Sequence, residues 1–301
     1  MAYGQLDFDN GTYVHSATRY RIKLEPNVLY RFRIAAVNRG GISFKTPTYC
    51  AMYCPTAKKQ VLIVDGFQRL STPAVINTPL QQGFDPRQDP GVQYGATYNW
   101  LGYQQVFDKK HIGIETASGL GYTNDSLMAH LVMGSDMQHV ATHAEAIQRA
   151  GAYSILSCSS DAFALQSLQL TSNTIIDLVL GLQKEDKYSR ISYKTFPVAL
   201  QKRLERCVQH CCNVLVSGAY LGSDVKQPAE KEFLSRILGI EHQGTYRDSS
   251  NVLYGMNTQF QFYNQLNEQH YPATSCDVIY PTSSAFTILT YSNQMPAAVA
   301  H

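Results

Sequence analysis

The sequence predicts an α/β protein whose main domain is built on a doubly wound, mostly parallel sheet. Two observations lead to this fold class. After residue 59, four apolar runs that end in Gly, Ser or Asp are separated by stretches with helical periodicity. Unbroken apolar runs are typical of strands buried on both faces, as in a parallel sheet covered by helices. Before residue 58, apolar and polar residues alternate instead, which indicates half-buried antiparallel strands.

The alternating region predicts an antiparallel β module over residues 1–57. In the stretch "LYRFRIAAVNRGG", Tyr30, Phe32 and Ile34 would point to one face and Arg31 and Arg33 to the other. The letters "NRGG" predict a turn between two strands.

Residues 58–301 predict parallel strands that alternate with helices, as in a flavodoxin-like sheet. The apolar runs predict strands over residues 60–67, 153–160, 175–182 and 213–220. Apolar stripes with helical spacing predict one helix that ends at Gly151, a second that begins near Pro197 and a third over residues 229–240.

A long segment at about residues 68–125 separates the first strand from the first of these helices. It is rich in glycine and tyrosine and holds the single tryptophan, Trp100, close to Tyr103. A structureless loop of this length is uncommon in a compact domain unless it has a function. Two interpretations stay open: a stacking platform for sugar rings, or a glycine-rich lid packed by its own aromatic side chains.

The overall composition favours an exported protein that meets uncharged ligands. Charged residues make up 16% of the 301 residues, tyrosine occurs 20 times and the formal net charge is +2. No cluster of Lys and Arg interleaves with aromatic residues, so nucleic acid is not expected as a partner. No apolar run is long enough to span a membrane and no export signal opens the chain. We expect a secreted, periplasmic or cell-surface location, a carbohydrate or cell-wall ligand, and further domains in the parent protein.

Neither a cofactor nor a metal ion is predicted. The chain has no Walker lysine motif and no G-x-G-x-x-G that opens a helix after the first strand. Seven cysteines cannot all pair within one chain. Cys207, His210 and Cys211 lack a second ligand pair with zinc-like spacing, which favours ordinary buried thiols.

Candidate catalytic residues follow from the rule that doubly wound sheets bind ligands beyond the carboxyl ends of their strands. They are Asp65, Arg69, Ser159 and Glu185, which follow strands, together with His143, a candidate base in the helix that leads into the second strand.

A serine hydrolase would pair Ser159 with His143 as its base, and Asp65 or Asp161 would orient that histidine. The structural alternative makes Ser159 a helix N-cap and His143 a capping or core residue. Cys158, between two serines, is expected to point into the core.

A uronate lyase is the other chemistry that these residues would suit. Arg69 with Glu185 would form a carboxylate-binding or acid–base pocket, and a tyrosine or histidine, in principle Tyr220, would serve as the base. The residues expected to bind substrate are Trp100, Tyr103, Tyr220, Ser223 and Asp224.

The first region resembles the second half of a fibronectin type III module, whose early strands would be missing or contributed from upstream. The matching residues are Tyr30, Phe32, Arg33, Ile34, Ala36, Asn38, Gly41, Ser43 and Pro47.

The segments "VLIVDGFQRLSTPA", "TIIDLVLGLQKED", "FPVALQKRLERCV" and "LVSGAYLGSDV" are similar to a Bacteroidetes family of exported proteins. Its members carry a fibronectin type III module before a flavodoxin-like domain. They are commonly labelled xanthan lyases and sometimes N-acetylmuramoyl-L-alanine amidases. The resemblance covers residues 12–301 and implies a polysaccharide- or cell-wall-directed enzyme.

The same domain also resembles the class I glutamine amidotransferase fold, whose nucleophile would fall on Tyr220 in "SGAYLGSD". A phenol does not replace a cysteine thiolate, so amidotransferase chemistry is not expected. Family members also tend to have Gly-Gly where this chain has Cys211-Cys212, which predicts a locally adjusted helix end.

Two functions therefore remain. The first is a secreted hydrolase or lyase that uses the strand-end residues beneath the aromatic insertion. The second is a non-catalytic glycan-binding or structural module on an amidotransferase-like scaffold, with Tyr220 at the lost nucleophile position.

Overall fold

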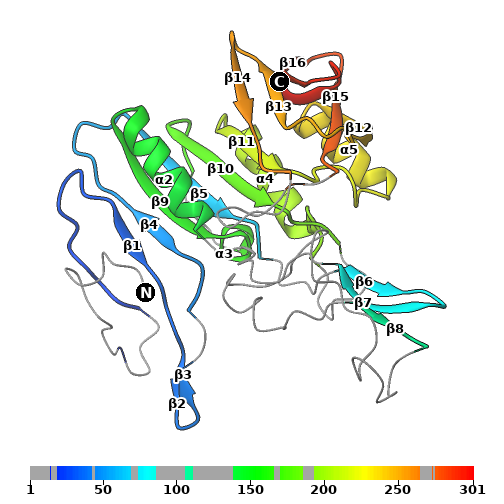
Figure 1. Cartoon of the computed structure of the whole chain (residues 1–301). Helices are drawn as coiled ribbons and strands as arrows, with labels where there is room; N and C mark the ends of the chain where they lie inside the picture. The colour runs from blue at the N-terminus through cyan, green and yellow to red at the C-terminus, as the bar shows by residue number, and fades with distance from the viewer. Residues whose placement is uncertain are drawn as a thin grey trace.

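The computed structural model confirms the mixed α/β character, with one parallel sheet and several antiparallel sheets (Figure 1). The structure describes residues 14, 19–42, 45–68, 74–85, 106–110, 138–165, 170–185, 193–264, 273 and 275–301.

The centre of the molecule is a four-stranded sheet in which every neighbouring pair is parallel. Its strands are β5 (Lys59–Asp65), β9 (Tyr153–Ser159), β10 (Thr174–Gly181) and β11 (Asn213–Gly218). In space they lie in the order β11-β10-β5-β9, so the first strand of the sheet lies between the second and the third. All four coincide with predicted strands. The order reverses between β5 and β10, which places a topological switch point there.

Helices cover both faces of this sheet. On one face, α2 (His139–Ala150) packs on β5, β9 and β10, and its Val140, Ala141 and Ala144 share a core with Val61 and Ile63. The other face carries α3 (Ser160–Leu165), α4 (Val198–Gln209) and α5 (Pro228–Ile237). The core on that side is larger and includes Leu62, Val64, Phe163, Leu178, Leu204 and Phe233.

The N-terminal segment forms the predicted antiparallel hairpin, which then continues onto the edge of the parallel sheet. Strands β1 (Tyr30–Phe32) and β4 (Tyr49–Ala51) pair with each other, and β2 (Val37–Asn38) and β3 (Gly41–Ile42) flank the predicted turn. Just after β4, Met52 and Ile155 of β9 exchange two backbone hydrogen bonds of 2.9 Å. The hairpin therefore lies against β9, and Arg31 forms an ion pair with Glu145 of α2.

The C-terminal part is antiparallel, which the sequence did not predict. Strands β12 (Ile240–Thr245) and β15 (Asp277–Pro281) form one pair. A second sheet has the order β14-β13-β16-β17, from β13 (Val252–Gly255), β14 (Thr258–Gln261), β16 (Phe286–Tyr291) and β17 (Pro296–Ala300). Its first hairpin turns at Met256 and Asn257, which both have positive φ. Because such turns favour Asn-Gly, Met-Asn gave no signal.

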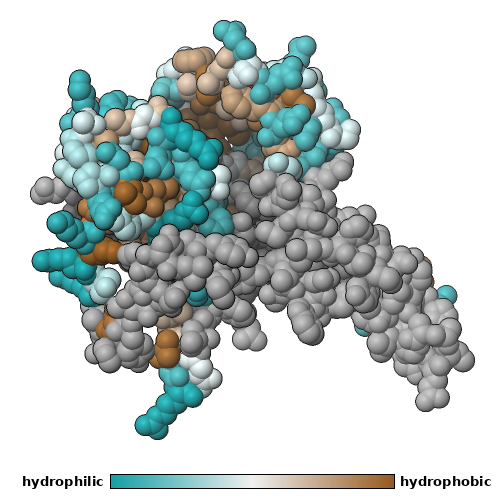
Figure 2. Space-filling view, turned by 60° about the vertical axis from the view of Figure 1, so that its left-hand side comes forward, coloured by the Kyte–Doolittle hydropathy of each residue, from teal (hydrophilic) through white to brown (hydrophobic). Residues whose placement is uncertain are grey.

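The segment predicted as an insertion contains a three-stranded antiparallel sheet made of β6 (Ala74–Asn77), β7 (Gln81–Asp85) and β8 (Val106–Asp108). Figure 1 shows this sheet standing apart from the parallel one. Figure 2 shows hydrophobic residues as separate patches among hydrophilic ones. Within the described ranges, no helix has the length and apolar character to cross a membrane.

The end of α4 is adjusted as the Cys-Cys sequence predicts. Cys211 adopts a left-handed conformation with φ of 57°. The N–H of Cys211 donates to the carbonyl of Val208, and the N–H of Cys212 donates to the carbonyl of Cys207. These two bonds define a Schellman motif, in which glycine is the preferred residue at the position of Cys211.

Replacement of Cys211 by glycine should therefore stabilise the protein. Glycine removes the strain of the left-handed conformation, and this outweighs the extra entropy that glycine has in the unfolded chain. The free energy of unfolding should rise by about 0.5–1 kcal/mol. Urea unfolding of the wild type and Cys211→Gly measures this gain. The same change at Cys212, whose side chain is buried, should instead destabilise the protein. A lower stability for Cys211→Gly would contradict the interpretation of the helix end.

Candidate functional site

The carboxyl ends of the parallel strands bring several candidate residues to one edge of the sheet. Asp65 ends β5 and pairs in register with Ser159, which ends β9. Glu185 follows β10, and residues 219–227 follow β11. Since α2 connects the carboxyl end of β5 with the amino end of β9, its first turn lies at this same edge.

Asp65 is bound by His139, which was not among the predicted site residues. Its carboxylate is fully buried, and Oδ1 lies 2.8 Å from Nε2 of His139, the first residue of α2. Oδ1 also accepts the backbone N–H of Phe67 at 3.1 Å. The other carboxylate oxygen and Nδ1 of His139 are buried and have no hydrogen-bond partner among the described residues.

A second histidine and aspartate meet one helical turn further along α2. Nδ1 of His143 lies 2.8 Å from Oδ2 of Asp177, in the middle of β10. The Asp177 side chain is 4% exposed, whereas that of His143 is 30% exposed. A buried carboxylate that holds one ring nitrogen fixes the tautomer and orientation of an imidazole and leaves the other nitrogen for proton transfer.

This pairing corrects the expected orientation of His143. Asp65 does not orient it, because Asp65 binds His139. Asp161 does not orient it either, because it lies in the first turn of α3, a helix on the opposite face of the sheet. Asp177 takes that role.

Ser159 occupies the position of a helix cap. Its Oγ accepts the N–H of Ala162 at 3.2 Å, at the start of α3, and no hydrogen bond of the described residues joins it to His143. Cys158 packs against the larger core, and burial raises the pKa of its thiol to about 11. The thiol is therefore protonated at neutral pH and is a poor nucleophile.

Tyr220, at the expected elbow, is a packed side chain. It is 6% exposed and shares a small cluster with Phe67 and Leu182. Nζ of Lys184 lies 4.3 Å from the centre of its ring.

The two glycines of the elbow serve close packing and have no positive φ. A Cβ on Gly218 would lie 2.9 Å from Cβ of Leu180, and one on Gly222 would overlap His242.

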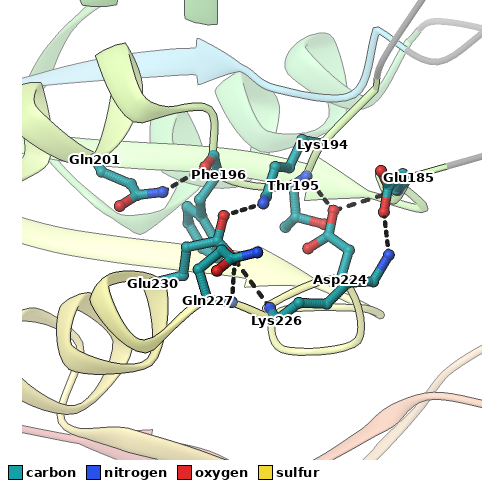
Figure 3. Close-up of polar contacts among 9 residues, drawn as sticks. All are labelled: Glu185, Lys194, Thr195, Phe196, Gln201, Asp224, Lys226, Gln227 and Glu230. Atoms are coloured by element: carbon teal, nitrogen blue, oxygen red, sulfur yellow. Dashed lines mark hydrogen bonds and ion pairs between the residues drawn. The ribbon is translucent and has the colours of Figure 1, made fainter.

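Asp224 and Glu185 belong to a polar cluster beyond β10 and β11 (Figure 3). Oδ2 of Asp224 accepts the N–H of Thr195 at 2.7 Å and that of Glu185 at 3.3 Å. Asp224 thus binds the backbone at two points that are ten positions apart in the sequence. Burial raises the pKa of its carboxyl group.

Glu185 itself faces solvent and pairs with Lys226 at 2.5 Å. The hydrogen bond from Lys226 lowers the pKa of Glu185. A general acid needs a raised pKa, so Glu185 has the wrong environment for that role.

Ser223 is held by a carboxylate of the C-terminal strands. Oδ2 of Asp277 accepts the N–H groups of Gly222 and Ser223 at 2.7 and 2.8 Å, and Oδ1 accepts the Ser223 hydroxyl. Nε2 of His242 lies 3.3 Å from Oδ1 of Asp277, in an ion-pair contact rather than an aligned hydrogen bond. Because the aspartate lies between serine and histidine, this trio does not have the order of a hydrolase triad.

Three predicted site residues, Arg69, Trp100 and Tyr103, lie outside the described residues. His139 and Asp177 were not among the predicted site residues, although the sequence carries a signal for each. His139 and His143 stand four residues apart on a helix, and Asp177 is a charge inside an apolar strand. In the described part of the chain, no group of three or more His, Cys, Asp or Glu side chains is arranged to hold a metal ion.

Comparison of the chain with protein-family models, curated proteins and solved structures found no match.

Loss of the Asp224 carboxylate should destabilise the protein. Asp224→Ala leaves two backbone N–H groups without their acceptor, at an expected cost of about 2–4 kcal/mol in the free energy of unfolding. Asp224→Asn keeps one acceptor oxygen and should cost less. Glu232→Ala, at an exposed side chain of α5, should change stability by less than about 0.5 kcal/mol. Chemical denaturation measures all three, and an unaffected Asp224→Ala would exclude the anchoring role.

His242 should make stability depend on pH near neutrality. The Asp277 carboxylate raises the pKa of His242 from its ordinary value of 6.5. A raised pKa in the folded state contributes stability that is complete below 6.5 and is lost as the pH rises through the folded value. The free energy of unfolding from about pH 5.5 to about pH 8 should therefore fall more steeply in the wild type than in His242→Gln. Parallel curves would rule out the ion pair as the cause.

Proposed function

We propose that the chain is a carbohydrate- or cell-wall-directed hydrolase or lyase in which His143, oriented by Asp177, is the acid–base group. The observation that carries this proposal is the 2.8 Å contact between Nδ1 of His143 and a buried carboxylate in the middle of β10, one of the two strands that flank the sheet's switch point. A partly exposed imidazole held in this way is suited to take a proton from water or from a carbon acid.

A mechanism without a covalent serine, cysteine or tyrosine intermediate agrees best with the surroundings of the other candidates. Ser159 caps α3, Cys158 is a buried thiol of raised pKa and Tyr220 is packed. His143 would then act directly on the substrate or on a water molecule. Asp177 would keep the imidazole in one tautomer and stabilise its protonated form.

A flavodoxin-like or amidotransferase-like sheet and a partial fibronectin type III module are part of the same proposal. The strand order, with the first strand between the second and the third, supports a flavodoxin-like or amidotransferase-like sheet. The hairpin from Tyr30 to Ala51 supports a partial fibronectin type III module. With this assignment we propose membership of the Bacteroidetes family of exported proteins and a secreted, periplasmic or cell-surface location.

The second candidate function is a glycan-binding module without catalysis. It is favoured by Tyr220, a packed aromatic residue at the position that the resemblance to amidotransferases assigns to the nucleophile. In that case the His–Asp pairs serve only to give the buried carboxylates beneath α2 their polar partners.

Turnover and binding, measured together, separate the two functions. The full chain is screened on ester, amide and uronate-containing glycan substrates, and binding to each glycan is measured by calorimetry. His143→Gln should lower kcat by about 10²–10⁴-fold, with binding and the circular dichroism spectrum unchanged. Asp177→Asn should also lower kcat and shift the pH profile, because the tautomer is no longer fixed.

His210→Gln is the matched control, because His210 is an exposed histidine at the end of a helix. Full activity in His143→Gln would eliminate the acid–base role. Glycan binding without turnover by the wild type would favour the second candidate.

A further inference from the structure

Two buried cysteines occupy the contact positions of the Schellman motif at the end of α4. With His210 as the C-cap, Cys207 is the third residue back along the helix and Cys212 is the second residue beyond the cap. In a Schellman motif the side chains at these two positions commonly contact each other across the turn. Here both are thiols, 1% and 7% exposed, and both belong to the larger core.

The backbone holds these two residues together. The N–H of Cys212 donates to the carbonyl of Cys207 at 3.0 Å, which closes the turn between them. Burial raises the pKa of Cys207 to about 11, and the neighbouring Cys212 thiol contributes to this shift.

We propose that Cys207 and Cys212 are a disulfide-forming pair that closes the end of α4 when the chain folds in an oxidising compartment. The oxidant is a small-molecule disulfide such as oxidised glutathione. One Cys thiolate attacks it and forms a mixed disulfide, and the second thiolate then displaces the remaining glutathione. The Sγ–Sγ bond forms, the S–S bond of the oxidant breaks, and the two cysteine protons leave on two glutathione thiols.

The timing of this step follows from burial. In the folded, reduced protein little thiolate is present at Cys207, so direct oxidation is slow. During folding both thiols are solvated and have ordinary reactivity. The bond should therefore form on refolding in a redox buffer far more readily than on treatment of the folded protein.

Cys211 lies between the pair in sequence but is placed differently. It is exposed and sits at the left-handed position of the turn. It should remain a free, alkylatable thiol when the other two are joined. In the reduced state the Cys212 thiol instead donates to the carbonyl of Thr171 at 3.4 Å, a contact that oxidation removes.

The test is a thiol map of the full chain, refolded in a mixture of reduced and oxidised glutathione and then alkylated with iodoacetamide. Trypsin releases all three cysteines in one peptide, residues 207–226. This peptide should carry one carbamidomethyl group and lack the mass of two hydrogen atoms. The oxidised protein should also have a higher melting temperature than the same sample treated with dithiothreitol.

Variants identify the partners. Cys211→Ser should retain the crosslink, whereas Cys207→Ser and Cys212→Ser should each abolish it. Cys158→Ser, at a cysteine that packs against the same core, should leave it intact. Three carbamidomethyl groups on a folded wild-type chain would overturn the proposal. Loss of the crosslink in folded Cys211→Ser would do the same, because it would assign the bond to Cys211.

Discussion

The central constraint on this structure is the burial of two carboxylates in its parallel sheet. Asp65 and Asp177 lie on adjacent strands, face the same helix and are almost fully enclosed. An unpaired carboxylate in such a place is strongly destabilising, so each needs a partner that can donate a hydrogen bond or carry positive charge. His139 and His143 supply both partners from one face of α2. The rotation and height of α2 over the sheet are therefore set by polar pairing as well as by its apolar stripe.

Carboxylates elsewhere in the chain organise the connections after the strands. Asp224 binds backbone N–H groups at Glu185 and Thr195, and Asp277 binds those of Gly222 and Ser223. In both cases one oxygen receives two backbone donors, which is among the stronger arrangements available to a buried acid. Ser223 and Asp224, which were site candidates because of their position after β11, are thus engaged in structural hydrogen bonds. For this reason the acid–base proposal rests on His143.

The parallel sheet was predictable because its strands are unbroken apolar runs such as 60–67 and 175–182, and burial on both faces requires that composition. The hairpin of β13 and β14 was not predictable, because its strands have only four residues each and its Met-Asn turn lacks the usual glycine. The candidate site was predictable only in part. Asp65 follows from the strand-end rule and His143 from its helix before β9, but their partners depend on which helix face meets which strand. That is a tertiary property that spacing along a single sequence does not fix.

The backbone pairing of Met52 with Ile155 lets the N-terminal segment cover the exposed edge of the parallel sheet. Without the hairpin, the outer edge of β9 would be a bare strand edge, the kind of surface on which chains pair with one another and aggregate. Cys50 and Met52 also fill the core beneath α2. A fragment that begins at residue 58 would therefore lose both edge protection and part of the packing that seats His139 and His143. For recombinant production, the α/β part of this chain should therefore be expressed together with the β segment before it to remain soluble.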